Sequence, residues 1–402
     1  MEYRDQLKYI KAHQKEEGRG NGKRKRKMRK ISAINYFLWM VQIGASFFFM
    51  GSMAILGILP RWCMIAVAAL LVLFILLVKA LQRRARRSRK KRSTGKGLAF
   101  LLSVVLIVVG FYGLKVNAAL DKIAIGEENG GDMKQHQIPV TEQPFNVYIS
   151  GIDVYGDLEQ ESRSDVNLIA TINPRTHKIL LTTTPRDYYV TIPGISGEER
   201  DKLTHAGNYG VETSMATLEN LYGTEIPFYV RVNFTSVEEI VDVMGGIDVE
   251  SELAFTTSKA AGEVVEVHEG TNHFNGKQAL AFVRERKALA TGDNQRGKNQ
   301  QALLTALIKK TMSPMILLQA NKMINSVAGN ADTNLSENQI KSLIRMQISK
   351  MEGWDIESVA AEGDDTGKKY CYSYKGGPLY VTVPYESSVE EIRQKMEEVL
   401  EN

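Results

Sequence analysis

The sequence contains only two cysteines and none of the short motifs that identify the most familiar catalytic sites. It has no cysteine and histidine spacing typical of a zinc site, no phosphate loop of the P-loop type and no G-x-S-x-G element. Cys63 lies in an apolar run long enough to span a membrane and Cys371 lies outside that run, so we expect no disulfide between them. There is also no internal repeat, and the 402 residues suffice for one or two domains with a core.

Acidic residues are scarce in the first part of the chain. The net charge of +5 conceals this asymmetry, because residues 1–116 carry 24 Lys and Arg against 4 Asp and Glu. Residues 117–402 carry 27 Lys and Arg against 42 Asp and Glu. A difference of this size predicts that the two parts lie in different surroundings.

Three long apolar runs account for this difference, at residues 34–59, 62–81 and 98–114. A helix needs about 20 apolar residues to cross a hydrocarbon core about 30 Å thick, and each run is close to that length. Three runs so close together disfavour buried core helices, and the long segment before the first run disfavours a cleavable signal peptide. We therefore predict three transmembrane helices.

The basic residues predict the orientation of these helices. They concentrate in residues 23–30, before the first run, and in residues 83–96, between the second and third. The positive-inside rule places both segments in the cytoplasm, so the N terminus lies inside and the chain after residue 115 lies outside the cell. Contact with anionic membrane lipid explains the basic segments better than binding to nucleic acid, which we do not expect as a partner.

Composition divides the chain into five parts. We expect a basic cytoplasmic tail over residues 1–30, a membrane unit over residues 31–116 and a polar connector over residues 117–144. An extracellular catalytic domain over residues 145–312 follows, with a C-terminal extension of helices and strands over residues 313–402.

Short apolar runs predict strands in the extracellular part, and segments with helical spacing predict helices between them. The expected strands are residues 145–152, 166–172, 179–184, 188–192, 228–232, 247–249, 356–360 and 379–383. The expected helices are residues 211–221, 234–244 with Thr235 or Ser236 as N-cap, a pair within 275–301, helices within 314–349, and 387–400. This alternation predicts an α/β fold in which helices cover both faces of a sheet.

Several arginines flank a predicted turn near the middle of this part. Arg284 and Arg286 end one predicted helix, and Arg296 opens the next. The turn between them contains Gly292 and Asp293. Converging guanidinium groups repel one another unless an anion lies between them, and their planar forked donors match phosphate oxygens. A phosphate or pyrophosphate site and an exposed polar helix-turn-helix both stay open from this stretch alone.

Other charged residues flank the predicted strands, where ligands of sheet proteins bind. Asp153 follows the first strand and Asp165 precedes the second, so the two carboxylates lie at adjoining strand ends. Paired carboxylates near arginines suit magnesium, or manganese in its place, bridging the protein to phosphate. Turn or capping roles are the alternative for both aspartates. Arg186 and Asp187 follow the third strand, whereas His205 is more typical of packing or capping than of catalysis.

These residues belong to a series of motifs. In chain order the motifs are ISGID, SRSDVNLI, TTTPRDYYV, DKLTHAGNYG, VMGGIDVE, HFNGKQALAFVRERK and GDNQRGKNQQ. They span roughly residues 145–312, and this part of the chain resembles the LytR-CpsA-Psr family of cell-wall glycopolymer ligases. The resemblance implies an α/β/α sandwich with a mixed central sheet, and a long apolar groove for a polyprenyl chain.

The resemblance also implies an activity. Such an enzyme is a phosphotransferase that moves an anionic glycopolymer, either teichoic acid or a capsular or wall polysaccharide, from undecaprenyl pyrophosphate to a sugar hydroxyl of peptidoglycan. Magnesium assists the reaction. The implied location is the cell membrane of a Gram-positive-type envelope, with a multi-pass anchor and an extracellular catalytic domain.

Site residues follow from the resemblance, motif by motif. Asp153 and Asp165 would hold the metal. Catalytic roles fall to Arg186, Asp187, Arg284 and Arg286, and pyrophosphate binding to Arg163, Lys202, Arg284, Arg286, Arg296 and Gln300. Asp187 and Asp165 are the candidates for a base. One position departs from the pattern D-x-x-R-x-x-R-Q, because Asn299 replaces the second arginine and only Lys298 beside it could restore the charge.

Two other functions stay open. A membrane-bound regulator would act through the basic cytoplasmic segments, although the predicted topology keeps the arginines away from DNA. A hydrolase would use water in place of the sugar acceptor, so that the polymer is released instead of attached to the wall.

Overall fold

The computed structural model describes residues 34, 36–87, 94–123, 138–152, 163–289, 293–311, 331–350 and 352–401. Internal contacts divide the chain into two compact units, Met1–Leu114 and Lys115–Asn402. The predicted basic tail and residues 312–330 lie outside the described residues.

Within the described residues, three helices are long and apolar enough to cross a membrane: Tyr36–Leu56, Arg61–Leu81 (in α2, Arg61–Arg87) and Lys96–Ala118 (in α3, Thr94–Ile123). Large apolar side chains cover their surfaces, and Phe47, Ile65 and Leu70 are each more than half exposed. A contiguous apolar surface of this kind suits lipid tails better than water. The three helices occur where the sequence predicts them.

The second unit is built on a six-stranded mixed sheet with the strand order β11-β6-β1-β2-β3-β12. Its strands are β1 (Phe145–Ile152), β2 (Val166–Asn173), β3 (Lys178–Thr183), β6 (Phe228–Asn233), β11 (Ala331–Thr333) and β12 (Asp355–Ala360). β1 is parallel to β6 and β3 is parallel to β12. The other three neighbouring pairs are antiparallel.

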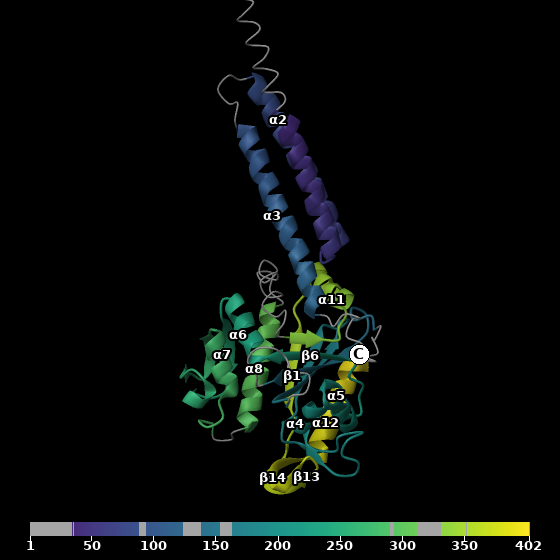
Figure 1. The fold of residues 1–402 in the computed structure, drawn as a ribbon, viewed down its shortest axis with the longest axis vertical. Helices are drawn as coiled ribbons and strands as arrows, with labels where there is room; N and C mark the ends of the chain where they lie inside the picture. The colour runs from purple at the N-terminus through teal and green to yellow at the C-terminus, as the bar shows by residue number, and fades with distance from the viewer. Residues whose placement is uncertain are drawn as a thin grey trace, which may run out of the picture. The chain divides into compact units, whose positions relative to one another are not determined.

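Successive side chains of a strand point to opposite faces of the sheet, and helices bury both faces. Tyr148, Ile169 and Leu180 pack on one face, together with side chains of α5 and α12. Leu168 and Leu181 pack on the other face, with side chains of α8. Figure 1 shows α4, α5 and α12 on one side of the sheet and α6, α7 and α8 on the other. The predicted α/β/α sandwich with a mixed sheet is confirmed.

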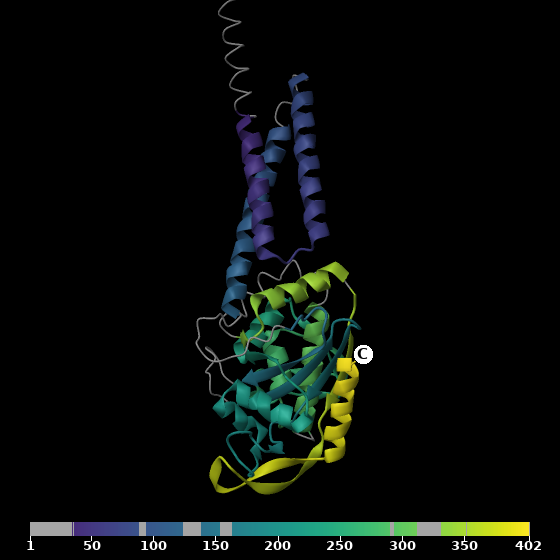
Figure 2. The ribbon, with the colours of Figure 1, turned by 90° about the vertical axis from the view of Figure 1, so that its right-hand side faces the viewer.

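The covering helices are α4 (Leu203–Ala206), α5 (Val211–Tyr222), α6 (Phe234–Val243), α7 (Gly276–Arg284), α8 (Asp293–Thr311), α11 (Glu337–Lys350) and α12 (Glu386–Glu401). Smaller pairs are β4 (Tyr189–Val190) with β5 (Asp201–Lys202), β7 (Ile247–Ser251) with β10 (Gly270–Phe274), and β8 (Phe255–Thr256) with β9 (Glu266–Val267). The hairpin of β13 (Gly363–Cys371) and β14 (Tyr374–Pro384) is yellow in Figure 2 and precedes α12.

Each predicted strand overlaps a strand of the structure, although the one expected at residues 188–192 is reduced to the two residues of β4. The N-cap of α6 is Asn233 and not Thr235 or Ser236. The Asn233 side chain accepts from the Ser236 N–H at 2.9 Å, and Ser236 Oγ accepts from the Asn233 N–H at 3.1 Å. This reciprocal box satisfies two backbone donors at once, which a cap one turn later would not do. Asp293 begins α8 instead of completing a turn, and Gly292 lies outside the described residues.

Candidate active site

The start of β2 and the segment after β3 meet at one rim of the sheet. The Asp165 N–H, directly before β2, donates to the Gly151 carbonyl of β1 at 3.0 Å. The Thr184 N–H, directly after β3, donates to the Asn167 carbonyl of β2 at 2.9 Å. Antiparallel pairing therefore brings Asp165 and Arg186, which are far apart in the sequence, to the same rim.

Asp165 and Arg186 form an ion pair at this rim, with 2.5 Å between Asp165 Oδ1 and Arg186 Nη1 and each side chain one quarter exposed. Arg186 Nε lies 3.7 Å from Asp187 Oδ2, and Lys202 Nζ lies 2.8 Å from Asp187 Oδ1. The four side chains form a row of alternating charge. Both carboxylates that the sequence offers as a base thus have cationic partners.

A cavity of about 370 Å³ lies at this rim, between β3, α8 and the end of β12. Four predicted site residues line it: Asp165, Arg186, Arg296 and Gln300. Five other predicted site residues are described but do not line this cavity: Arg163, Asp187, Lys202, Arg284 and Arg286. Asp153 lies outside the described residues. The fold thus joins two arginines and one carboxylate from three separate motifs, and we call this space the transfer cavity.

The two arginines beside α7 are organised by the glutamate between them. Arg284 ends α7, Arg286 is exposed, and Glu285 is fully buried. The Glu285 carboxylate accepts hydrogen bonds from the N–H groups of Arg286 at 2.8 Å and Ala288 at 2.9 Å, and from the Ser258 N–H. Burial alone would raise the pKa of Glu285, but these hydrogen bonds outweigh it and hold the pKa below 4.5. Glu285 therefore fixes the loop that carries both arginines.

We expect Glu285→Gln to destabilise the protein by about 3 kcal/mol, because an amide cannot satisfy every backbone donor that faces the carboxylate. The folded-state pKa is depressed, so this contribution is complete above pH 4.5 and is lost as the pH falls through the folded-state value. Thermal unfolding of the detergent-solubilised chain at a series of pH values measures both effects. The exposed neighbour Lys287→Gln is the control, and an equal loss in both variants would contradict the role of Glu285.

Asn299, which replaces the second arginine of the family pattern, does not line the transfer cavity. Asn299 is buried, its Nδ2 donates to the Phe282 carbonyl at 3.3 Å, and its Oδ1 accepts from Gln295 at 3.4 Å. The bond to Phe282 joins α8 to α7, and the bond from Gln295 lies within α8. Lys298, the neighbour that could restore the charge, does line the transfer cavity, and its Nζ lies 2.9 Å from Glu252 Oε2.

Thr183, which ends β3, is a further candidate site residue that the sequence does not reveal. Its side chain lines the transfer cavity and is 5% exposed, and its hydroxyl has no hydrogen-bond partner among the described residues. A buried hydroxyl without a partner is costly, which makes it a candidate for contact with a ligand. Thr183 sits in an apolar run of the sequence, and no local pattern distinguishes it from the neighbouring Thr182.

His205 has a packing role, as its sequence context favours. It is buried, with Nδ1 2.6 Å from Asp201 Oδ1 and 2.8 Å from Ser373 Oγ. Burial alone would raise the pKa of Asp201, but hydrogen bonds from His205, Ser373 and the Lys202 N–H lower it below its ordinary value. This cluster ties the segment after β4 to the β13–β14 hairpin, away from the transfer cavity.

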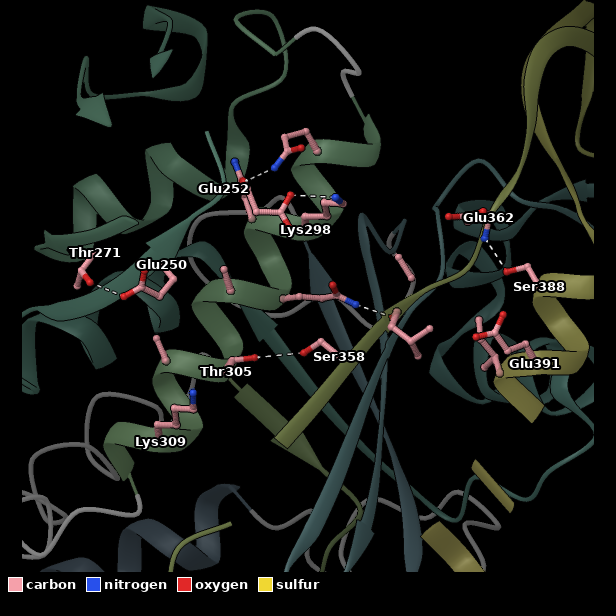
Figure 3. A pocket seen from close by; sticks show the side chains of 18 of the residues that line it. Glu250, Glu252, Thr271, Lys298, Thr305, Lys309, Ser358, Glu362, Ser388 and Glu391 are labelled. Atoms are coloured by element: carbon pink, nitrogen blue, oxygen red, sulfur yellow. Dashed lines mark hydrogen bonds and ion pairs between the residues drawn. The ribbon is translucent and has the colours of Figure 1, made fainter. Parts of the chain in front are cut away.

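A second cavity of about 820 Å³ adjoins the transfer cavity, and five residues line both: Gln295, Lys298, Ala360, Glu362 and Tyr385. Figure 3 shows Lys298 and Thr305 on α8 across from Glu362, Ser388 and Glu391. Most of the residues that line it are polar or charged. The apolar groove that the family resemblance implies stays a prediction.

The metal prediction rests on few ligands. Among the described residues, no group of three or more His, Cys, Asp or Glu side chains is placed to hold a metal ion. Magnesium, however, usually takes only one or two carboxylates and completes its shell with phosphate oxygens and water. Asp165 lines the transfer cavity and can supply one carboxylate. The donor set therefore fits a magnesium ion that arrives with a phosphate ligand.

The described part of the chain thus combines a mixed sheet between two helical layers, a charged cavity at its rim and three apolar helices. The chain belongs to the LytR_cpsA_psr family, whose sequence model matches residues 112–395. The predicted membership of this family is confirmed.

Two relatives are named polyisoprenyl-teichoic acid–peptidoglycan teichoic acid transferases. TagV of Bacillus subtilis is 27% identical over 314 residues, which are 76% of this chain and 78% of TagV. TagU of Bacillus anthracis is 31% identical over 280 residues, which are 68% of this chain and 89% of TagU.

Solved structures of relatives share the fold. The crystal structure of B. subtilis TagV matches with a TM-score of 0.54 and 25% identity, over 65% of this chain and 98% of that one. A structure of TagT bound to LIIa-WTA matches with a TM-score of 0.53 and 26% identity, over 68% of this chain and 98% of that one.

Proposed function

We propose that this chain transfers a teichoic acid or another anionic wall glycopolymer from undecaprenyl pyrophosphate to a sugar hydroxyl of peptidoglycan. The observation that carries the proposal is the transfer cavity, which joins Arg186, Arg296 and Asp165. The names of TagU and TagV support the choice of polymer and acceptor. The detergent-solubilised full-length chain, given labelled lipid-linked polymer and peptidoglycan, tests it: labelled peptidoglycan supports the proposal, and unchanged donor contradicts it.

The charges of the transfer cavity suit a pyrophosphate handle. Guanidinium groups bind phosphate oxygens with two parallel hydrogen bonds, and Arg186 and Arg296 line the cavity from two different elements, the segment after β3 and α8. Negative charge grows on the lipid phosphate as it leaves, and fixed cations placed before the reaction stabilise that charge. Asp165 orients Arg186 through their ion pair.

Magnesium would be held by Asp165 together with Asp153, the residue that directly follows β1 in the sequence. Bound there, it would neutralise phosphate oxygens as a Lewis acid. The sheet supports this pairing of residues, because the Asp165 N–H bonds to Gly151, two residues before Asp153.

The basic segments predict the membrane topology of the chain. Residues 23–30 and 83–96 lie before the first span and between the second and third, which favours a cytoplasmic N terminus and an extracellular catalytic domain. This orientation places the transfer cavity on the side of the membrane where peptidoglycan lies. It leaves a nucleic-acid-binding regulator without access to the arginines.

Thr183 is expected to contribute a hydrogen bond to the bound pyrophosphate. We predict that Thr183→Val weakens binding of a polyprenyl pyrophosphate-linked saccharide about 10- to 100-fold, because a hydrogen bond to a charged group contributes about 1.5–3 kcal/mol. Valine keeps the shape of threonine and leaves no buried hydroxyl unpaired, so the melting temperature should not fall. Equilibrium binding and thermal unfolding of the solubilised chain measure the two effects.

Thr182→Val is the matched control. Thr182 is also buried with an unpaired hydroxyl among the described residues, but strand alternation turns it to the opposite face of the sheet. Its substitution should leave donor binding unchanged. Equal loss of binding in both variants, or in neither, would remove Thr183 from the site.

A further inference from the structure

The second cavity adjoins the transfer cavity, with which it shares lining residues. Glu362 and Tyr385 line both, and so do Gln295 and Lys298 of α8. The rest of its lining comes from α8, from β7 and β10 on one side of this helix, and from β12 and the start of α12 on the other (Figure 3). A molecule lying in it would reach the pyrophosphate handle at the junction of the two spaces.

The second cavity suits a sugar strand better than the anionic polymer. Five carboxylates line it against two lysines: Asp248, Glu250, Glu252, Glu362 and Glu391 against Lys298 and Lys309. Lys298 is paired with Glu252, so the charge that a ligand meets is negative and repels a polyanion. Hydroxyl groups of Thr305, Ser358 and Ser388 offer both donors and acceptors to sugar hydroxyls.

An aromatic ring stands at the junction. Tyr385 is 49% exposed and lines both cavities, while its N–H donates to the Glu362 carbonyl at 3.1 Å. An exposed tyrosine presents an apolar ring face with a polar tip, which matches the apolar face and hydroxyl rim of a sugar ring. Such a platform would hold an acceptor ring beside the pyrophosphate.

Glu362 is the carboxylate best placed to take a proton at this junction. Among the described residues, only Asp165 and Glu362 bring carboxylates to the transfer cavity, and Asp165 is paired with Arg186. The Glu362 side chain is exposed, and its carboxylate makes no hydrogen bond or ion pair within the described part of the chain.

The backbone of Glu362 is held in place even though its carboxylate is accessible. Its carbonyl accepts from the Tyr188 hydroxyl at 2.6 Å, and its N–H donates to Ser388 Oγ at 3.0 Å. Tyr188 is fully buried in the core of the sheet. A fixed backbone with an accessible carboxylate is the arrangement that a general base needs, because geometry limits proton transfer before basicity does.

We propose that the second cavity binds the sugar acceptor and that Glu362 is the base which deprotonates its hydroxyl. This inference rests on the proposed function. The acceptor oxygen forms a bond to the phosphorus that carries the polymer, and the bond from that phosphorus to the bridging oxygen breaks. The electron pair leaves with the lipid phosphate, and the acceptor proton passes to the Glu362 carboxylate.

Glu362→Gln in the full-length solubilised chain tests the base. We expect kcat for transfer to peptidoglycan to fall about 100-fold, within the range typical of a general base. Binding of the polyprenyl pyrophosphate-linked saccharide and the KM for peptidoglycan should change less than 3-fold. Glu362→Asp should recover part of the rate. Asp365→Asn removes the same charge three residues further along the chain, in β13. Because Asp365 lines neither cavity, this variant should transfer at the wild-type rate.

Each outcome has a distinct meaning. Wild-type kcat in Glu362→Gln overturns the base assignment and leaves the proposed function standing. Loss of donor binding in the same variant also overturns it, because the carboxylate then serves the donor. Failure of the wild-type chain to label peptidoglycan defeats the proposed function itself. Tyr385→Leu tests the cavity separately: a raised KM for peptidoglycan supports it, and an unchanged KM contradicts it.

Discussion

Arg186→Ala is expected to reduce transfer of the polymer about 1000-fold, since removing one preformed donor to a developing oxyanion typically costs this much. Arg186 lines the transfer cavity and is the partner of Asp165 at 2.5 Å. Its loss removes a bidentate contact to phosphate and leaves the Asp165 carboxylate without this partner, which repels the anionic donor. Arg186→Lys keeps the charge without the planar fork, so we expect an intermediate rate.

The rates are measured with the purified full-length chain and labelled lipid-linked polymer. Arg175→Ala is the control, because Arg175 is exposed in the turn between β2 and β3, at the opposite end of both strands. Unchanged thermal unfolding separates a catalytic loss from a folding defect. Transfer by Arg186→Ala within 10-fold of the wild type would show that the pyrophosphate binds elsewhere.

Removal of divalent metal is expected to reduce transfer about 100-fold, with recovery on addition of magnesium, because a Lewis acid contributes several kcal/mol at a phosphoryl group. Asp165→Asn should raise the magnesium concentration needed for half-maximal rate. Asp165 lines the transfer cavity. In the proposal it binds magnesium together with Asp153.

Magnesium titrations of the two proteins make this test quantitative. Asp365→Asn, whose carboxylate lies outside both cavities, should need no additional magnesium. Full activity of the wild type in the presence of a strong chelator would contradict a metal at this site. Asp165→Asn with the wild-type magnesium requirement would assign Asp165 to orienting Arg186 only.

The sheet is well predicted because its strands are strongly apolar and buried on both faces. Residues 145–152 and 166–173 each supply side chains to two cores, so their sequences are nearly continuous apolar runs. The missed strands lack this signal. β13 reads GDDTGKKYC and is mostly exposed, and β11 is only three residues at the sheet edge. Neither has an apolar period long enough to distinguish it from a loop.

The candidate site is predicted in part for a similar reason. Charged residues at strand ends are visible in the sequence, so Asp165 and Arg186 are both predicted as site residues. The structure pairs them. Thr183, Glu285 and Glu362 are not found, because their roles depend on burial or on contacts with distant segments. The sequence predicts Arg284, Arg286 and Arg296 equally as phosphate ligands. Only the fold shows that Glu285, between Arg284 and Arg286, is buried and binds the backbone of this loop.

The central claim is that a lipid-linked polymer is transferred to a sugar acceptor in the transfer cavity. The most direct test follows both products of the wild-type chain, given donor labelled in the polymer and in the lipid. We predict peptidoglycan-bound polymer and lipid phosphate in equal amounts, and neither without peptidoglycan. Lipid phosphate formed together with free polymer would identify a hydrolase and contradict the account.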